Sequence, residues 1–304
     1  MFLKKKFAML MSERIAAIVV TYNRKNLLLE CLNGILSQTK PVDAIFLVDN
    51  ASTDGTPEML KERGYIKDLP PENLAEPWEG KFEIKNLFDG RDIEVHYIRM
   101  HENTGSSGGF YEGMKRAYEK GYDWLWLMDD DGVPTEDCLR NQLPLSHDLI
   151  TGPTVVTQDN VKVWDYSIFS DRKKFYMKIY DLLKIPYKTI AFNGFLISRN
   201  VVEKIGFPDP YFFIQCDDVE YSWRALKHGY ELQVVENAFF IHPKPNSSSL
   251  NKMNTKTLYF YVRNNIIVSK RYDFFFVRTF VRITKLFRLF IITPDISRKK
   301  VILK

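Results

Sequence analysis

The feature that most constrains this chain is a series of short apolar segments in its first half, each ending at polar side chains. Such runs, rich in β-branched residues, are typical of buried parallel strands. Between them, apolar residues recur at helical spacing, as at Leu28, Leu32 and Ile35. Strands that alternate with helices predict an α/β fold with a mainly parallel sheet flanked by helices. The predicted strands are IAAIVVTYN from residue 15, AIFLVDN from residue 44, IEVHYIRM from residue 93 and YDWLWLMDDD from residue 122.

Polar groups stand at the carboxyl ends of three predicted strands: Thr21–Tyr22–Asn23, Asp49–Asn50 and Asp129–Asp131. These ends meet at one edge of a parallel sheet, where ligands of open α/β folds bind. Three adjacent carboxylates repel one another, and burial penalises each of them. A divalent cation would compensate, because carboxylates suit Mg²⁺ or Mn²⁺ and both Asp129 and Asp131 can face forward from the strand end. An exposed acidic turn is the alternative, since Asp is common in turns.

Residues 66–92 interrupt this alternation with Pro70, Pro71, Pro77 and several acidic side chains. We interpret them as an inserted loop. It is either a lid that carries Trp78 or a solvated insertion.

The net charge of +5 is unevenly distributed, because residues 270–304 carry +8 and the rest of the chain −3. The three cysteines lie far apart and form no CxxC pair, which argues against disulfides or a zinc site and fits a reducing cytosol. The N-terminal apolar run FAMLM has no small-residue cleavage site after it, so we expect no signal peptide. Met11 is an alternative to Met1 as the native start.

Seven stretches, in order between residues 15 and 243, resemble family 2 glycosyltransferases, the inverting enzymes of GT-A (Rossmann-like) fold that transfer a sugar from a nucleotide-diphosphate donor. The combination of VDNAS, a DDD triplet and DDVEYSWR is most similar to the galactofuranosyl- and rhamnosyltransferase branch. The resemblance implies a GT-A catalytic domain at 12–245, in which 12–131 bind the nucleotide-sugar and 132–245 the acceptor. The seven stretches are IVVTYNR, FLVDNASTDGT, NTGSSGGF, WLMDDDG, FNGFLISR, FFIQCDDVEYSWRALKHGY and FFIHP.

By this resemblance, seven residues would contact the nucleotide-sugar. Asp49 and Asn50 would hold its base and ribose together with Thr21–Tyr22, and Asn50 stands where many members of the family carry a second aspartate. Asn50 donates as well as accepts hydrogen bonds, so its contact with the base can differ from that of an aspartate. The nucleotide of the donor is therefore not fixed as UDP, and dTDP is the alternative. Asn103 and Gly105 would lie along the nucleotide, where a glycine allows close backbone approach. The nucleotide-sugar residues implied are Thr21, Tyr22, Asp49, Asn50, Asn103, Gly105 and Asp130.

The resemblance also implies a metal ligand far along the chain. His242 follows the apolar run FFI and would join Asp129 and Asp131 on a metal ion. Imidazole suits Mn²⁺ better than Mg²⁺, so the expected cofactor is Mn²⁺ or Mg²⁺. A hydrogen-bonded core histidine is the alternative interpretation of His242.

The stretch CDDVEYSWR predicts the start of a helix with an acidic first turn. By the family pattern Asp218 would be the general base that deprotonates the acceptor hydroxyl, and Asp217 and Glu220 would position the acceptor or hold the loop. A helix-capping acidic cluster is the alternative, and the two roles are compatible. Asn193 and Gly194 resemble the turn at which the donor sugar and the acceptor meet.

Within a C-terminal helical region at 246–304, residues 271–292 are apolar but carry cations throughout. On a helix, Arg271, Arg278 and Arg282 form one stripe, which excludes a membrane-spanning helix and favours one that lies on an anionic membrane surface. A helix packed on the catalytic domain or on a dimer partner is the alternative, so homo-oligomerisation stays open. Nucleic acid is a poor partner, because no recognition motif accompanies this stripe.

Together these features predict a metal-dependent, inverting glycosyltransferase at the cytoplasmic face of a bacterial membrane. It would move galactofuranose or rhamnose to a glycan, lipid-linked, in capsule, O-antigen or cell-wall synthesis. Two rival interpretations are a metal-dependent nucleotidyl- or phosphotransferase and a non-catalytic membrane-surface scaffold. The first would not need Asp218, and the second would show no metal-dependent nucleotide binding.

Overall fold

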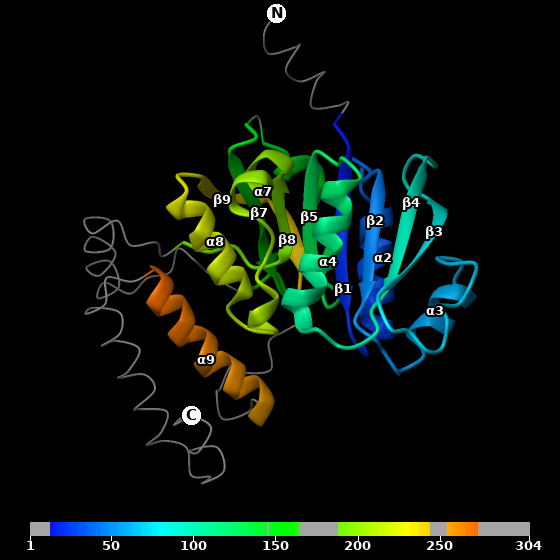
Figure 1. Ribbon diagram of the computed structural model, residues 1–304. Helices are drawn as coiled ribbons and strands as arrows, with labels where there is room; N and C mark the ends of the chain where they lie inside the picture. Colours follow the sequence, from blue (N-terminus) through cyan, green and yellow to red (C-terminus); the bar gives the residue numbers. More distant parts are fainter. Residues whose placement is uncertain (1–12, 145, 164–187, 244–253, 273–304) are drawn as a thin grey trace, which may run out of the picture.

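Strand β1 (Ile15–Thr21) shows why this sequence forms a sheet covered by helices on both faces. All seven of its residues are buried, and successive side chains of a strand point to opposite faces. The side chains at positions 15, 17 and 19 belong to the core cluster that contains helix α2 (Lys25–Leu36), and those at 16, 18 and 20 to the cluster that contains helix α4 (Gly105–Glu119). A strand that is apolar on both faces is therefore buried between two layers of helices (Figure 1).

The computed structural model describes residues 13–144, 146–163, 188–243 and 254–272. Besides β1, its strands are β2 (Ala44–Asp49), β3 (Trp78–Lys85), β4 (Asp92–Arg99), β5 (Trp124–Asp129), β6 (Val133–Pro134), β7 (Leu149–Val156), β8 (Asn193–Ser198) and β9 (Glu231–Ile241). They form one sheet in the order β3-β4-β2-β1-β5-β8-β7-β9-β6. The neighbours β4, β2, β1 and β5 are parallel, whereas β3 and β8 pair antiparallel with the two ends of this group. The predicted α/β fold is confirmed, with antiparallel strands added at both sides of its parallel centre.

The helices divide between the two faces. Beyond α2 and α4 they are α3 (Thr56–Glu62), α5 (Cys138–Gln142), α7 (Arg199–Ile205), the 3₁₀ turn η1 (Pro210–Phe212), α8 (Asp217–Lys227) and α9 (Thr255–Tyr272). Buried residues of α7 and α8 join the core under α4, and those of α5 join the core under α2. The helices predicted after the first three strands and at CDDVEYSWR are thus confirmed as α2, α3, α4 and α8.

Glycines allow helix α4 to lie close to the sheet. A Cβ on Gly113 would come within 2.5 Å of Ile18 Cγ2 in β1, so a larger residue would push the helix outward. This close contact brings the first turn of α4 to the carboxyl end of β1.

The interpretation of residues 66–92 as an inserted loop is wrong for their second half, which forms β3. The burial of Gly80 and Phe82 alternates with the exposure of Lys81 and Glu83, as expected for an edge strand with one covered face. Trp78 is not on a free lid, because β3 pairs with β4 along its whole length.

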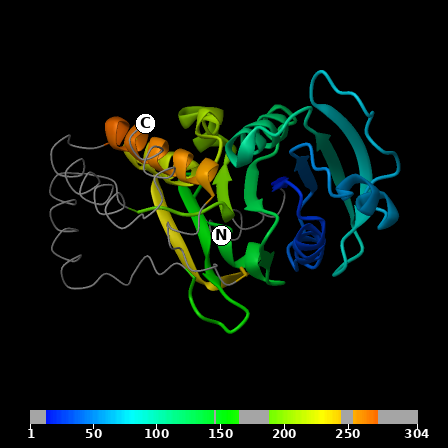
Figure 2. The same cartoon turned by 90° about the horizontal axis from the view of Figure 1, so that it is seen from below.

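Helix α9 lies along α8, as Figures 1 and 2 both show. Phe212, Trp223 and Val268 form a small core between the two helices and η1. The predicted membrane-facing segment lies outside the described residues, apart from Arg271 and Tyr272, which close α9.

Candidate active site at the carboxyl ends of the strands

The polar strand ends lie side by side. In the parallel register, Thr21 is opposite Asp49 and Val20 is opposite Asp129. Asp49 is in turn opposite Arg99 at the end of β4. The prediction that these groups share one edge of the sheet is confirmed.

The acidic residues Asp129, Asp130 and Asp131 crowd the end of β5. Burial, and then the charges of the neighbouring aspartates, raise the pKa of Asp129 well above its usual value. Burial also raises the pKa of Asp130, to about 6, although the Arg24 charge and the Thr21 hydroxyl oppose it. The charged forms of Asp129 and Asp130 are therefore less stable here than in water, whereas at Asp131 burial is outweighed by His242 and Arg24, which lower its pKa.

Arg24 supplies part of the missing positive charge from within the chain. Its Nη1 lies 3.1 Å from Asp130 Oδ1 and 2.7 Å from Asp131 Oδ2. Thr21 Oγ1 donates to Asp130 Oδ2 at 2.5 Å, so the protein satisfies both oxygens of that carboxylate. Tyr22, between the two donors in sequence, is 43% exposed. Arg24 was not among the predicted site residues, although a cation directly after a polar strand end was a usable signal.

His242, at the end of β9, points at the same acidic residues. Its Nε2 lies 3.4 Å from Asp131 Oδ1, and its Nδ1 lies 2.7 Å from the Pro243 carbonyl oxygen. A carbonyl only accepts, so Nδ1 carries the hydrogen, and in the neutral ring the lone pair that binds a metal is on Nε2. Burial lowers the pKa of His242, but its hydrogen bond and ion pair with Asp131 outweigh burial and raise it.

The donor types at this edge fit Mn²⁺ or Mg²⁺, since they are two carboxylates and an imidazole. In the part of the chain that the structure describes, however, no three His, Cys, Asp or Glu side chains are arranged as a complete metal site. Asp131 and His242 converge, while the carboxylate of Asp129 receives no hydrogen bond from the described residues. The protein alone thus provides an incomplete coordination shell.

Asp49, at the end of β2, is fully satisfied. Its Oδ2 accepts hydrogen bonds from Tyr97 Oη at 2.7 Å and Arg99 Nη1 at 2.6 Å, and its Oδ1 accepts from the Ser52 amide at 2.8 Å. The residue is 0% exposed. This carboxylate therefore fixes the turn after β2 from inside the protein.

Asn50 ties that turn to the glycine-rich loop before α4. Its Nδ2 donates to the Gly105 carbonyl at 2.8 Å, and its Oδ1 accepts from Thr104 Oγ1 at 3.0 Å. Asn103 Oδ1 accepts from the Gly105 amide at 2.8 Å. Gly105 has φ +75°, and a Cβ there would lie 2.1 Å from the Phe213 carbonyl oxygen, so only glycine fits. An amide at position 50 serves both a donor and an acceptor, which a carboxylate could not.

Asp217 and Asp218 open α8 beside the same loop. Ser106 Oγ donates to Asp217 Oδ2 at 2.9 Å, and the Asp217 charge reaches across the edge and helps to raise the pKa of Asp129. Burial, and then the charge of Asp217, raise the pKa of Asp218 to about 7. A carboxyl group with such a pKa can take up a proton near neutral pH, as a general base must.

Glu220 is directed to α9. It accepts hydrogen bonds from Tyr272 Oη at 2.6 Å and Arg271 Nη1 at 3.3 Å, and it pairs with Arg224 one turn further along α8. Its carboxylate is 2% exposed. Glu220 therefore joins two helices.

Asn193 begins β8 at the irregular pairing with β5, opposite Met128. The residue is buried, and its Oδ1 has no hydrogen-bond partner within the described ranges. A buried acceptor of this kind calls for a ligand or a water molecule. The carbonyl of the next residue, Gly194, accepts from Gln142 Nε2 at 2.7 Å, which fixes the backbone of the turn.

Similarity to known proteins identifies the family of this chain. The model of glycosyl transferase family 2 matches residues 16–71 and 81–206, more than half of the chain. The chain belongs to this family. It is 28% identical over 246 residues to the galactofuranosyltransferase GlfT1 of Mycolicibacterium smegmatis, covering 76% of this chain and 72% of that protein. It is 24% identical over 241 residues to the dTDP-rhamnosyl transferase RfbF of Shigella flexneri, covering 76% and 70%. The resemblance seen in the sequence is confirmed.

Two solved structures share the GT-A fold with this family 2 glycosyltransferase. The S. aureus TarS fragment 1–349 in complex with UDP-GlcNAc has a TM-score of 0.53 at 14% identity, covering 86% of this chain and 67% of that one. The mannosyltransferase PcManGT from Pyrobaculum calidifontis, in complex with GDP-Man and Mn²⁺, has a TM-score of 0.50 at 16% identity, covering 84% and 66%. At these identities the likeness supports the fold of the family 2 chain.

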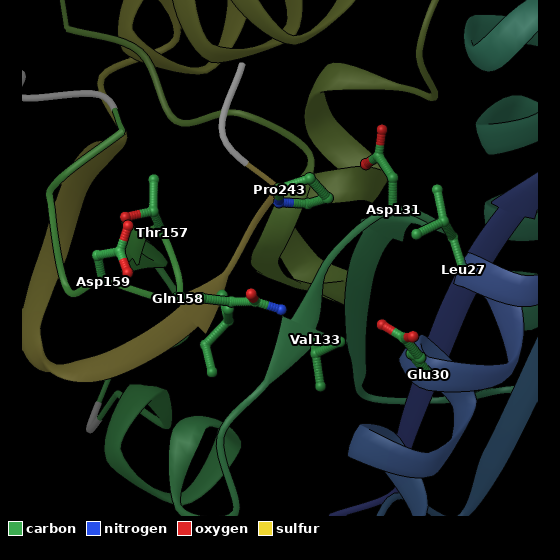
Figure 3. A pocket seen from close by; sticks show the side chains of 9 residues that line it. Leu27, Glu30, Asp131, Val133, Thr157, Gln158, Asp159 and Pro243 are labelled. Carbon is green, nitrogen blue, oxygen red and sulfur yellow. The ribbon is translucent and has the colours of Figure 1, made fainter. Parts of the chain in front are cut away.

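A cavity of about 390 Å³ adjoins the acidic edge of the glycosyltransferase (Figure 3). Asp131 lines it from the β5–β6 connection, Val133 from β6, Glu30 from α2, and Pro243 from the segment after β9. Asp131 is therefore in the wall of a space that a ligand can enter.

No helix in the described part of the glycosyltransferase is long and apolar enough to cross a membrane. Of the predicted cationic stripe, only Arg271 lies within the described residues. Its guanidinium pairs with Asp209 at 2.8 Å and Glu220 at 3.3 Å, so this arginine contributes to helix packing.

Proposed function

We propose that this chain is an inverting glycosyltransferase that moves galactofuranose or rhamnose from a UDP- or dTDP-linked donor to a lipid-linked glycan of the bacterial cell surface. The names of the two relatives, a galactofuranosyltransferase and a dTDP-rhamnosyl transferase, support these sugars. One structural observation carries the proposal. Two acidic groups from distant segments, Asp129–Asp131 and Asp217–Asp218, meet at one edge of the sheet, close enough for Asp217 to raise the pKa of Asp129.

The donor would bind at the ends of β1, β2 and β5, in the half formed by residues 12–131. Tyr22 is exposed there, and the loop that Asn50 and Asn103 brace provides backbone groups close to the strand ends. The acceptor would bind against residues 132–245, where the Asn193 oxygen, which has no partner among the described residues, would accept a hydroxyl hydrogen. The buried carboxylates of Asp49 and Asp130 would stabilise this donor site through hydrogen bonds within the protein.

We further propose that Asp129, Asp131 and His242 hold Mn²⁺ or Mg²⁺. The convergence of Asp131 Oδ1 and His242 Nε2 supports this set, as does the lack of a hydrogen bond from the described residues to the Asp129 carboxylate. When bound, the ion would neutralise the diphosphate of the donor, whose oxygens would complete the shell. Arg24 would then hold Asp130 and orient Asp131.

Asp218 would take the proton from the acceptor hydroxyl as that oxygen attacks the anomeric carbon. Its raised pKa and its place at the start of α8 support this role. Asp217 would keep the loop in place through Ser106, and Glu220 would keep α9 in place. The lipid-linked acceptor and a peripheral position on the inner face of the membrane are supported by the basic, aromatic tail sequence.

A donor screen tests this function. The chain is incubated with UDP- and dTDP-sugars, a polyprenyl-linked glycan acceptor and Mn²⁺, and release of the nucleotide diphosphate is measured with and without EDTA. Release that needs metal and acceptor, and is fastest with UDP-galactofuranose or dTDP-rhamnose, is expected. Cleavage that releases a monophosphate would favour a nucleotidyl- or phosphotransferase instead. The absence of metal-dependent nucleotide binding in calorimetry would favour a scaffold.

A further inference from the structure

The turn of residues 212–216, directly before α8, has an unusual backbone. Phe213, Gln215 and Cys216 have φ values of 62°, 72° and 63°, in the left-handed region that favours glycine. Residues with side chains persist there only where surrounding contacts impose the conformation. Because the acidic pair Asp217–Asp218 follows at once, this turn decides where both carboxylates lie.

Asn264 of α9 holds the turn from one side. Its side chain is fully buried, and its Nδ2 lies 2.8 Å from the Phe212 carbonyl oxygen, 2.9 Å from that of Ile214 and 2.7 Å from that of Gln215. Arg263 Nη2 adds a contact of 3.2 Å to the Phe212 oxygen. Three carbonyl oxygens directed at one place repel one another unless donor hydrogens lie between them, and a side-chain amide brings two.

The glycine-rich loop holds the turn from the other side. The Ser107 amide donates to the Phe213 carbonyl at 3.1 Å, and the same oxygen lies where a Cβ on Gly105 would be. Ser106 Oγ donates to Asp217 just beyond the turn. The turn is therefore fixed between the loop assigned to the nucleotide and helix α9, which runs beside α8 in Figure 1.

We propose that Asn264 is a positioning residue for sugar transfer: its amide holds the 212–216 turn in the one conformation that presents Asp218 to the acceptor hydroxyl. This inference rests on the proposed function, in which Asp218 is the general base. Asn264 touches neither substrate and acts through the turn. Helix α9 is on this view part of the catalytic apparatus, although it lies beyond the residues that match the family model.

The Asn264→Asp variant tests the proposal, because it keeps the shape of the side chain, removes both donor hydrogens and places negative charge against three carbonyl oxygens. We expect kcat to fall roughly 10–100-fold, as for a reacting group displaced by a fraction of an ångström to an ångström. The Kd for Mn²⁺ and nucleotide diphosphate, measured by calorimetry, should stay within about twofold, since the Asn264 amide contacts none of the residues assigned to the donor. Asn264→Ser keeps one donor and should give an intermediate kcat; it replaces the aspartate variant if the latter does not fold.

Asn86→Asp is the matched control. Asn86 is likewise buried, and its Nδ2 donates to the Leu36 carbonyl at 2.7 Å, but it lies in the β3–β4 connection, away from α8. Both variants introduce the same charge next to backbone carbonyls, so both lower thermal stability. Only Asn264→Asp should lower kcat at a temperature where both variants are folded.

Amide hydrogen exchange gives a second readout that needs no sugar donor. Exchange in residues 213–220 should accelerate in Asn264→Asp and stay at the wild-type rate in Asn86→Asp. Equal kcat losses in the two variants, or wild-type exchange in residues 213–220 of Asn264→Asp, would overturn the positioning role. A wild-type chain that transfers no sugar, but whose turn loosens in Asn264→Asp, would contradict the function of Asp218 and support the hold on the turn.

Discussion

Asp49 and Asp129 end two strands that both adjoin β1, yet the protein treats their charges differently. Asp49 is fully buried and accepts hydrogen bonds from Tyr97, Arg99 and the Ser52 amide. The Asp129 carboxylate receives none from the described residues, and burial and its acidic neighbours raise its pKa. A buried charge is tolerated when it is paired and hydrogen-bonded. Asp49 meets that condition within the protein, whereas Asp129 meets it only when a proton or a cation arrives.

Asp218 resembles Asp129 in this respect. Among the described residues its side chain accepts hydrogen bonds only from backbone amides, that of Val219 at 2.7 Å, and its pKa is raised to about 7. Carboxylates that a protein leaves incompletely stabilised cluster at functional sites, because a bound ligand or a proton then stabilises them. The contrast with Asp49 separates a carboxylate that holds the scaffold from carboxylates to which the proposed function gives a role with ligands.

The largest effect is expected for Asp218→Asn. An amide of the same shape cannot take up the acceptor proton, so kcat for sugar transfer should fall by roughly 10²–10⁴-fold. Thermal stability should not fall, because the substitution removes a buried carboxylate beside Asp217. Steady-state kinetics and a melting curve measure the two quantities. If the variant keeps more than a tenth of the wild-type kcat, Asp218 is not the general base.

The paired variants Asp49→Asn and Asp129→Asn test whether the two carboxylates affect the stability of the protein differently. Asp49→Asn leaves Arg99 without its carboxylate, so the free energy of unfolding should drop by roughly 3–5 kcal/mol, as for a broken buried ion pair. Asp129→Asn relieves repulsion at the end of β5, so the metal-free protein should become more stable while Mn²⁺ binding weakens. Urea unfolding of both variants without metal measures this. Similar losses of stability in the two variants would erase the distinction between them.

His242→Ala should weaken Mn²⁺ binding by roughly tenfold or more, the range known for perturbed metal sites. The imidazole binds metal only when neutral, and its pKa is raised because the bond to Asp131 outweighs burial. Wild-type affinity should therefore fall as the pH drops through that raised pKa, and the affinity of His242→Ala should depend less on pH. Calorimetry at several pH values measures both, with the exposed His228→Ala as control. If the affinity for Mn²⁺ is unchanged in His242→Ala, then His242 is a hydrogen-bonded histidine at the strand end and not a metal ligand.

The parallel centre of the sheet and its polar edge could be predicted because they depend on local patterns. Apolar runs such as IAAIVVT are buried on either face, and parallel strands bring their carboxyl ends together in any register near the observed one. Strand β3 could not be found in this way. It is half exposed, prolines and acids precede it, and only its pairing with β4 makes it a strand.

The interaction partners of the site residues could not be predicted from the sequence either. Arg24 reaches residues more than a hundred positions away, and Asn264 reaches a turn about fifty positions before it. The left-handed turn itself gives no signal, because no glycine marks it. Residue types at strand ends can be read as chemistry, but which of them the protein satisfies depends on side chains that only the fold brings together.

The smallest effect, and the finest test of the comparison, concerns Asp217→Asn. The Asp217 charge is the second cause, after burial, of the raised Asp218 pKa, so its removal should lower that pKa. A general base works only when ionised, and a base with a lower pKa stays ionised at lower pH. The acidic limb of the kcat/KM profile, expected near pH 7 in the wild type, should therefore move to lower pH. The Ser106 hydroxyl can still donate to the new amide oxygen, so the loop should keep its place. The exposed Asp92→Asn should leave the limb unmoved, and a limb that stays in place in Asp217→Asn would show that the titrating group is a different residue from Asp218.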